Sequence, residues 1–167
     1  MTRYLYRRTC PLGCASSKLE LVVPGQSLRK RSTNMLRVTV SDLSVSSVGP
    51  VVLLKGETDD RTLPIFIMPP EAQAIVFRLN KVELPRPMTH DLLADMLKAL
   101  GAELKRIEIW DLKEGTFYGR LILSAHGKAL TIDSRPSDAI NLAMRCGAPI
   151  LVDEKVMNEA GLILDAE

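Results

Sequence analysis

The sequence predicts an α+β fold made of two copies of one unit, in which three strands precede two helices. In the segment 129–145, a short apolar β run ends at a proline and continues as an apolar helix that closes on an arginine. The segment 63–78 has the same order at a constant offset along the chain. The matched pairs are Pro69 and Pro136, Glu71 and Asp138, Ala72 and Ala139, and Arg78 and Arg145. Two copies are too few for a solenoid, so we expect one domain at 35–161 with pseudo-twofold symmetry.

The first copy begins at Met35, where apolar residues start to alternate with polar ones. Alternation of this kind is typical of a half-buried strand, and its interruption near Asp42 indicates a β-bulge. Turn-forming residues separate the apolar runs that follow. The expected strands are 36–45, 51–55 and 63–68, and the expected helix is 70–80.

A connector at 82–88, which carries two prolines, leads into the next helix. We expect that helix at 90–100, with Thr89 as its N-cap and Gly101 as its end. Apolar residues three and four positions apart predict its buried face. The residues expected there are Leu92, Leu93, Met96, Leu97 and Leu100.

The second copy repeats the order. Its expected strands are 104–112, 117–125 and 128–132, the last two joined by a tight turn at His126 and Gly127. The helix after Pro136 is apolar over most of its circumference, so we expect it to be mostly buried and to end at Gly147. The remaining expected features are an apolar segment at 149–152, a short helix at 154–160 capped by Asp153, and a tail at 162–167.

Charge separates residues 1–34 from the rest. They carry seven Lys or Arg and one acid, which leaves fifteen basic and nineteen acidic residues in 35–167. A basic, serine-rich segment without periodicity predicts disorder and fits a targeting peptide. The alternative, which we favour, is an upstream extension that is not normally translated, with Met35 as the start. The acidic balance of 35–167 argues against a protein that holds nucleic acid mainly by neutralising phosphates.

Composition excludes several other classes. The apolar runs are far shorter than a membrane span, so no membrane partner is expected. The count of three cysteines, with Cys146 at the end of an apolar helix, is typical of a reducing compartment and predicts the cytoplasm. Cys10 and Cys14 lack the second ligand pair that a zinc site needs. The chain has no Walker loop, nucleophile elbow or dinucleotide fingerprint.

The strand-to-helix break before Pro136 is the candidate site. Asp138, Asn141 and Arg145 share one stripe of an otherwise apolar helix, and Asp133 lies near the head of that stripe. A polar stripe on a buried helix indicates a functional site. The same residues would also fit a helix cap with a solvated edge.

His90 and Asp91 form a second polar feature, in the first turn of the helix expected at 90–100. Such a pair occurs in metal-dependent phosphohydrolases, but those sites need further His and Asp ligands. The other histidine of the chain, His126, lies in a predicted turn. A polar pair at a helix start is therefore the simpler interpretation.

Several motifs resemble the bifunctional nuclease domain family. They are 111–118, 132–145 with its Arg-Pro-Ser-Asp-Ala run, 148–152, and the shorter 87–93 and 63–67. The likeness covers about residues 35–161. It implies two β3α2 repeats that share one barrel-like mixed sheet with helices packed on it. It also implies metal-dependent cleavage of RNA and DNA, an activity ascribed mainly to plant members.

The residues and the resemblance together lead to a nuclease hypothesis. Phosphodiester hydrolysis needs a group that activates water and a cation that balances the charge developing around phosphorus. Mg²⁺ or Mn²⁺ would be held by Asp133, Asp138 and Glu71. The catalytic groups would be Asp133, Asp138, His90 and Tyr118, and the phosphate of RNA or DNA would be bound by Arg135, Arg145, Ser137 and Asn141.

The alternative hypothesis is a non-catalytic module that binds a ligand or a protein. In a non-catalytic module, Asp138 with Arg145, and Glu71 with Arg78, would be structural ion pairs. Under both hypotheses we expect a homo-oligomer, with a dimer favoured. An aromatic content of 4% favours this alternative, because proteins that bind single strands stack bases on aromatic rings.

Overall fold

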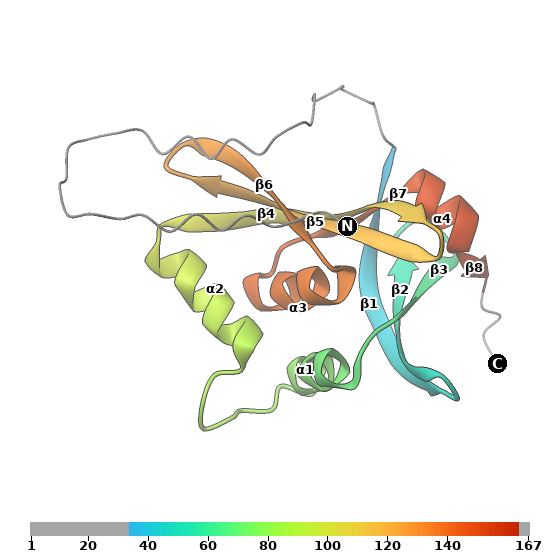
Figure 1. Ribbon diagram of the computed structural model, residues 1–167, viewed down its shortest axis with the longest axis horizontal. Helices are drawn as coiled ribbons and strands as arrows, with labels where there is room; N and C mark the ends of the chain where they lie inside the picture. Colours follow the sequence, from blue (N-terminus) through green and yellow to red (C-terminus); the bar gives the residue numbers. More distant parts are fainter. Residues whose placement is uncertain (1–33, 164–167) are drawn as a thin grey trace, which may run out of the picture. The chain divides into compact units, whose positions relative to one another are not determined.

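The computed structural model describes residues 34–163, so the predictions for residues 1–33 and 164–167 lie outside the described range. The described chain forms one mixed sheet with four helices (Figure 1). The strands are β1 (Met35–Ser46), β2 (Gly49–Gly56), β3 (Arg61–Phe66), β4 (Ala102–Lys113), β5 (Thr116–Ala125), β6 (Lys128–Ser134), β7 (Ile150–Asp153) and β8 (Leu162–Ile163). The helices are α1 (Pro69–Leu79), α2 (Thr89–Ala99), α3 (Pro136–Cys146) and α4 (Glu154–Ala160). No helix within the described range is long and apolar enough to cross a membrane.

The sheet has the order β6-β5-β4-β7-β1-β2-β3-β8. Two antiparallel three-stranded meanders flank β7, which runs antiparallel to β1 and parallel to β4. The predicted α+β class is confirmed. The predicted barrel-like closure is not seen, because the sheet is open within the described range. Its edges are β6 and the two-residue β8, which do not pair with each other.

The two halves agree in part. β1 and β4 each have 12 residues, and α1 and α3 each have 11. The second half departs from a simple repeat, because β7 lies between α3 and α4 where the first half has an irregular connector at 80–88. The internal duplication therefore stays a prediction.

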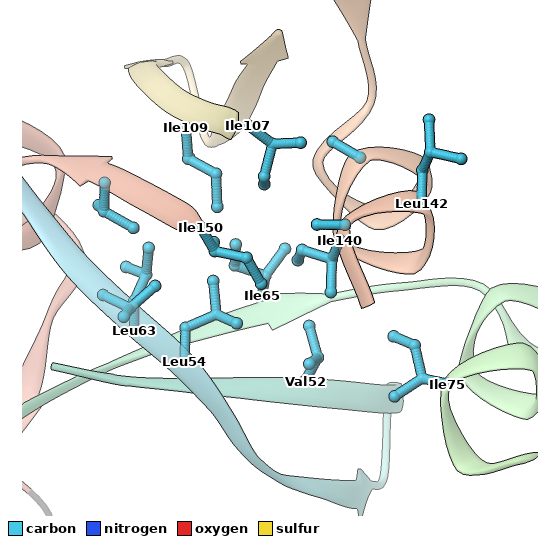
Figure 2. Packing of buried hydrophobic residues seen from close by; sticks show 14 of the residues in the cluster. Val52, Leu54, Leu63, Ile65, Ile75, Ile107, Ile109, Ile140, Leu142 and Ile150 are labelled. Atoms are coloured by element: carbon cyan, nitrogen blue, oxygen red, sulfur yellow. The ribbon is translucent and has the colours of Figure 1, made fainter. Parts of the chain in front are cut away.

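The core lies between the sheet and the helices, with both meanders contributing (Figure 2). Leu54 of β2, Leu63 of β3, and Ile107 and Ile109 of β4 are all 0% exposed. Full burial of a side chain of this size stabilises the fold by roughly 1.5–3 kcal/mol. Ile140 is one of the core residues of α3, which has seven buried residues, so the prediction of a mostly buried helix is confirmed.

Three local sequence signals are confirmed. The register of β1 against β2 shifts between Val40 and Asp42, at the predicted bulge. The side chain of Asp153 accepts a hydrogen bond from the backbone N–H of Lys155 at 3.0 Å and caps α4 as predicted. Gly147 ends α3 in the left-handed conformation, with φ of 66°. Each of these signals depends on chemistry within a few residues.

Helix α2 contradicts two predictions. Its N-cap is Met88, one residue before Thr89, and the Asp91 carboxylate accepts the N–H of Met88 at 2.9 Å. His90 and Ala94 are its buried residues, and Leu97 packs on the core. The other predicted core residues are exposed by 41–64%, namely Leu92, Leu93, Met96 and Leu100. Spacing shows which residues share a face, but the covered face is decided by the contact of α2 with α3 and β4.

Candidate functional site

The break between β6 and α3 is possible because β5 carries a glycine beside it. Gly119 pairs with Ser134, the last residue of β6. A Cβ atom on Gly119 would lie 2.8 Å from the carbonyl oxygen of Ser134 and 3.2 Å from the nitrogen of Pro136. Arg135 then has an extended backbone, with φ of −66° and ψ of 142°, and Pro136 begins the helix. The break therefore places the Arg135 side chain at the N-terminus of α3.

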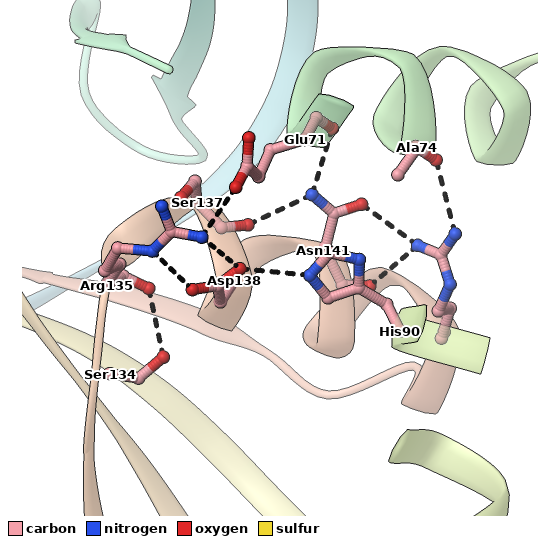
Figure 3. Close-up of polar contacts among 9 residues, drawn as sticks. Glu71, Ala74, His90, Ser134, Arg135, Ser137, Asp138 and Asn141 are labelled. Carbon is pink, nitrogen blue, oxygen red and sulfur yellow. Dashed lines mark hydrogen bonds and ion pairs between the residues drawn. The ribbon is translucent and has the colours of Figure 1, made fainter. Parts of the chain in front are cut away.

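Four charged or titratable side chains meet there: Glu71 of α1, His90 of α2, Arg135 and Asp138, which we call the Arg135 cluster (Figure 3). Arg135 Nε donates to Asp138 Oδ2 at 2.7 Å, and Arg135 Nη2 donates to Glu71 Oε1 at 2.6 Å. His90 Nε2 lies 3.1 Å from Asp138 Oδ1. The cluster thus joins three helices.

Two members of the cluster, Asp138 and Arg135, are held in their charged forms. Burial alone would raise the pKa of Asp138, but hydrogen bonds from Arg135 and His90 more than offset this, so the pKa lies below its ordinary 3.8. Hydrogen bonds to Asp138 and then to Glu71 raise the pKa of Arg135. The side chain of Arg135 is 59% exposed, while that of His90 is 10% exposed. The cluster therefore presents a guanidinium to solvent and keeps the imidazole inside.

Glu71 is the least satisfied member of the cluster. Its side chain is 12% exposed, and its Oε2 atom is buried without a hydrogen-bond partner among the described residues. A buried carboxylate oxygen without a partner is costly and rare in native proteins. This atom is therefore a free acceptor next to the guanidinium of Arg135.

The rest of the predicted stripe lies deeper in the protein. Asn141 is 0% exposed and donates to the backbone oxygens of Glu71 and Ser137, both at 3.1 Å. Arg145 Nη1 donates to the side chain of Asn141, and Arg145 Nε donates to Asp91 Oδ1 at 2.5 Å. Ser137 is 8% exposed. These residues cross-link α1, α2 and α3, and of the four predicted phosphate ligands only Arg135 is exposed.

The ion pairs predicted from the internal repeat are different in the structure. Asp138 pairs with Arg135 instead of Arg145, and Arg145 pairs with Asp91. Arg78 Nε donates to the backbone oxygen of Met144 at 3.0 Å and makes no ion pair with Glu71. Residues seven apart on a helix share a face, but they are two turns apart, about 10 Å, which is too far for a direct contact.

Asp133 and Tyr118 lie away from the Arg135 cluster. On β6, Ile132 pairs with Leu121, which packs on the core. Successive side chains of a strand point to opposite faces of a sheet, so Asp133 faces away from α3, opposite Arg120. Tyr118 is on the same outer face, with its ring centroid 6.0 Å from that of Trp110. The structure therefore does not bring these two residues together with Asp138.

The predicted metal ligands do not form a fitting donor set as arranged. Asp133 is on the other face of the sheet, and the guanidinium of Arg135 bridges Asp138 and Glu71. Both oxygens of Asp138 already accept hydrogen bonds. Glu71 Oε2 is therefore the one carboxylate oxygen of this pair that is free to coordinate a metal ion. Within residues 34–163, no three His, Cys, Asp or Glu side chains gather as a metal site requires. A bound divalent ion would have to displace Arg135.

Sequence reasoning missed a cavity of about 930 Å³ beside this network. It lies between the end of α1, the connector at 80–88 and the last turn of α3. Lys81 and Arg86 line it together with Arg78, Asp91 and Arg145. The available signal was the run of basic residues around a connector rich in prolines.

Comparison with known proteins gives a consistent result. The model of the bifunctional nuclease domain matches residues 52–165. An uncharacterised protein of Mycobacterium tuberculosis is 48% identical over 118 residues, which are 71% of this chain and 70% of that protein.

Plant proteins are more distant. Bifunctional nuclease 1 of Oryza sativa subsp. japonica is 30% identical over 115 residues, or 67% of this chain and 35% of that protein. Bifunctional nuclease 1 of Arabidopsis thaliana is 28% identical over 117 residues, 68% of this chain and 36% of that protein. The chain thus spans about a third of the length of the plant relatives. Because the domain model matches most of the described residues, this chain belongs to the bifunctional nuclease domain family.

Proposed function

We propose that the chain is a nuclease that cleaves phosphodiester bonds of RNA or DNA at the Arg135 cluster. The observation that carries this proposal is the contact of His90 with Asp138 beside the exposed guanidinium of Arg135. Family membership supports it, since the plant relatives bear the name bifunctional nuclease.

Proton transfer is assigned to His90. When water attacks phosphorus it loses a proton, and the leaving oxygen gains one as its bond to phosphorus breaks. An imidazole can accept the first proton and supply the second near neutral pH. Asp138 fixes the orientation of the ring through the 3.1 Å contact with Nε2. Asp138 is therefore a positioning residue for His90.

Binding of the phosphate is assigned to Arg135. A guanidinium has five N–H groups, and three of them donate to Glu71 and Asp138. The two N–H groups on Nη1 have no partner among the described residues. They can donate to the non-bridging oxygens of a phosphate and balance the charge that builds up there.

A divalent ion stays a prediction, and no step is assigned to it. Mg²⁺ or Mn²⁺ prefers carboxylate oxygens, and in the present arrangement Arg135 occupies the space between Asp138 and Glu71. Cleavage measured with Mg²⁺, with Mn²⁺ and with EDTA tests the dependence directly.

The test of the proposal compares the two histidines of the chain. The full-length protein and the variants His90→Asn and His126→Asn are incubated with a fluorescent RNA and a fluorescent single-stranded DNA. General acid–base groups contribute about 10²–10⁴-fold to rate, so His90→Asn should lose at least 100-fold. His126→Asn should keep full activity, because His126 is in the β5–β6 turn at φ of 50°, a conformation that Asn adopts readily.

Two results would contradict the proposal. Equal activity of the two folded variants would remove His90 from the reaction and point to a contaminating nuclease. Absence of cleavage by the unmodified chain under all metal conditions would favour the non-catalytic module.

The proposal extends to a homodimer in the cytoplasm. The apolar stripe of α2 supports self-association, because Leu92, Leu93, Met96 and Leu100 are each at least 41% exposed. Sedimentation velocity of the chain and of Leu93→Glu is the measurement. We expect a dimer that dissociates in the variant, and a monomeric unmodified chain would refute this part.

A further inference from the structure

The cavity between α1, the connector at 80–88 and α3 has an unusual lining. Its charged residues are the four cations Arg78, Lys81, Arg86 and Arg145 and the two carboxylates Glu83 and Asp91. Asp91 is already paired with Arg145. The cavity is therefore positive in a part of the chain that carries more acidic than basic residues.

Three of the four cations around the cavity have no ion-pair partner among the described residues. Nine of the Lys and Arg residues between positions 34 and 163 form ion pairs. Arg78, Lys81 and Arg86 form none with a described residue, although all three line one cavity. Arg78 donates through Nε to the carbonyl of Met144, and its two terminal nitrogens have no hydrogen-bond partner within residues 34–163. Three unpaired cations that converge on one cavity indicate an anionic ligand.

The same cavity has an apolar part. Leu79, Val82 and Leu84 line it and are 42%, 46% and 39% exposed. Apolar walls with a few convergent polar groups are typical of sites for small organic ligands, and 930 Å³ is within the usual size range of such sites. The ligand therefore combines negative charge with a flat or apolar group.

We propose that this cavity binds one nucleotide unit of a single-stranded nucleic acid, with its phosphate on Arg78, Lys81 and Arg86 and its base against the apolar wall. This inference rests on the proposed function, because it names the place where the substrate strand is held. Cationic side chains bind phosphate oxygens. Bases stack on aromatic rings without a requirement for sequence, and Phe77 is the aromatic residue of the cavity lining.

The cavity adjoins the Arg135 cluster through shared elements. Asp91 lines the cavity, and the preceding residue, His90, contacts Asp138. Arg145 also lines the cavity and is linked through Asn141 to the backbone of Glu71. A strand anchored in the cavity would thus lie next to the first turn of α2, which carries the imidazole assigned to proton transfer.

The test measures binding without cleavage. Isothermal titration calorimetry in EDTA uses three probes: inorganic phosphate, adenosine 5′-monophosphate, and a hexadeoxyadenylate with phosphorothioate linkages. The full chain is compared with the double variant Arg78→Gln/Arg86→Gln. The matched control is Lys55→Gln/Lys128→Gln, which removes two exposed, unpaired cations away from the cavity. Melting temperatures verify that both variants fold.

We expect the cavity variant to bind the hexanucleotide at least tenfold more weakly and the control less than twofold more weakly. The slope of log K against log salt should become shallower by about 1.4 in the cavity variant, since each lost phosphate contact on a single strand contributes about 0.7. Adenosine monophosphate should bind more weakly than the hexanucleotide.

Equal losses in the two double variants would overturn the proposal, because binding would then follow net charge. Unchanged binding in the cavity variant, or no binding of any probe by the full chain, would also overturn it. Equal affinity for the monophosphate and the hexanucleotide would refute a strand as the ligand. If the chain binds the hexanucleotide through the cavity but cleaves no nucleic acid, the proposed nuclease function is refuted and the proposed binding site is retained.

Discussion

The segments 63–78 and 129–145 have nearly the same order of residue types, but the protein uses them differently. Helix α3 has seven buried residues, whereas α1 has three. The arginine that ends α3, Arg145, has a side chain 6% exposed with partners on Asp91, Asn141 and Ala74. The arginine that ends α1, Arg78, is exposed and makes one hydrogen bond.

The acidic residues at the start of the two helices also differ. Both oxygens of Asp138 accept hydrogen bonds, while Glu71 uses one oxygen and buries the other without a described partner. The central position of α3, between α1, α2 and the β4–β5 hairpin, explains the contrast. Similar local sequence therefore gives similar secondary structure, and tertiary position decides whether a charge is structural or free to bind a ligand.

The largest expected effect separates the two arginines. Arg145→Ala removes four hydrogen bonds and leaves Asp91 without its partner, so it should lower the free energy of unfolding by about 3 kcal/mol. Arg78→Ala removes one exposed hydrogen bond and should cost about 0.5 kcal/mol or less. Urea denaturation of both variants is the measurement. Equal losses would show that the two segments are equivalent after all.

The second effect concerns the glycine that permits the break before α3. Gly119→Ala would place a methyl group 2.8 Å from the Ser134 carbonyl oxygen and 3.3 Å from Pro136 Cα, both backbone atoms. Overpacking of this kind costs about 1–3 kcal/mol, and we expect about 2 kcal/mol. Thr116→Ala, at the exposed start of the same strand, is the control. If Gly119→Ala is as stable as the control, the backbone between Ser134 and Pro136 can move away from the added methyl group without a loss of stability.

Much of the fold was predictable because its signals are local. Proline at the start of α1 and α3, Gly147 at the end of α3 and the Asp153 cap each act within one turn, and the structure has them all. Sheet closure is a long-range property. β6 and β8 are edges of an open sheet, and strand periodicity cannot show whether two edges meet.

The site was predictable in composition but not in pairing. Glu71, His90, Arg135 and Asp138 were all named from the sequence, and the structure brings them together. Asp133 was included because it is near Asp138 along the chain, but the alternation of side chains on β6 sends it to the other face. The unpaired cations around the cavity could not be recognised, because pairing depends on contacts between distant segments.

A smaller effect tests the charge state of Asp138. Its pKa is below 3.8 in the folded protein, so its contribution to stability is present above that pH and is lost as the pH falls through the folded value. Asp138→Asn removes the charge and should cost about 1 kcal/mol at pH 7. The loss of melting temperature between pH 7 and pH 3 should also be smaller in Asp138→Asn than in the unmodified chain. An unchanged acid dependence would mean that Asp138 is not the titrating group.

The smallest expected effect distinguishes the two carboxylates at the break. The side chain of Asp133 is exposed and makes no hydrogen bond with a described residue, so Asp133→Asn should change the free energy of unfolding by less than about 0.5 kcal/mol. It should also leave the cleavage rate per folded molecule unchanged, whereas Asp138→Asn should lower that rate because the imidazole of His90 loses its negatively charged partner. Rate and melting temperature are measured on the same preparations. A loss of activity in Asp133→Asn at full stability would bring Asp133 back as a ligand of a metal or of the substrate, and would mean that the outer face of β6 takes part in the reaction.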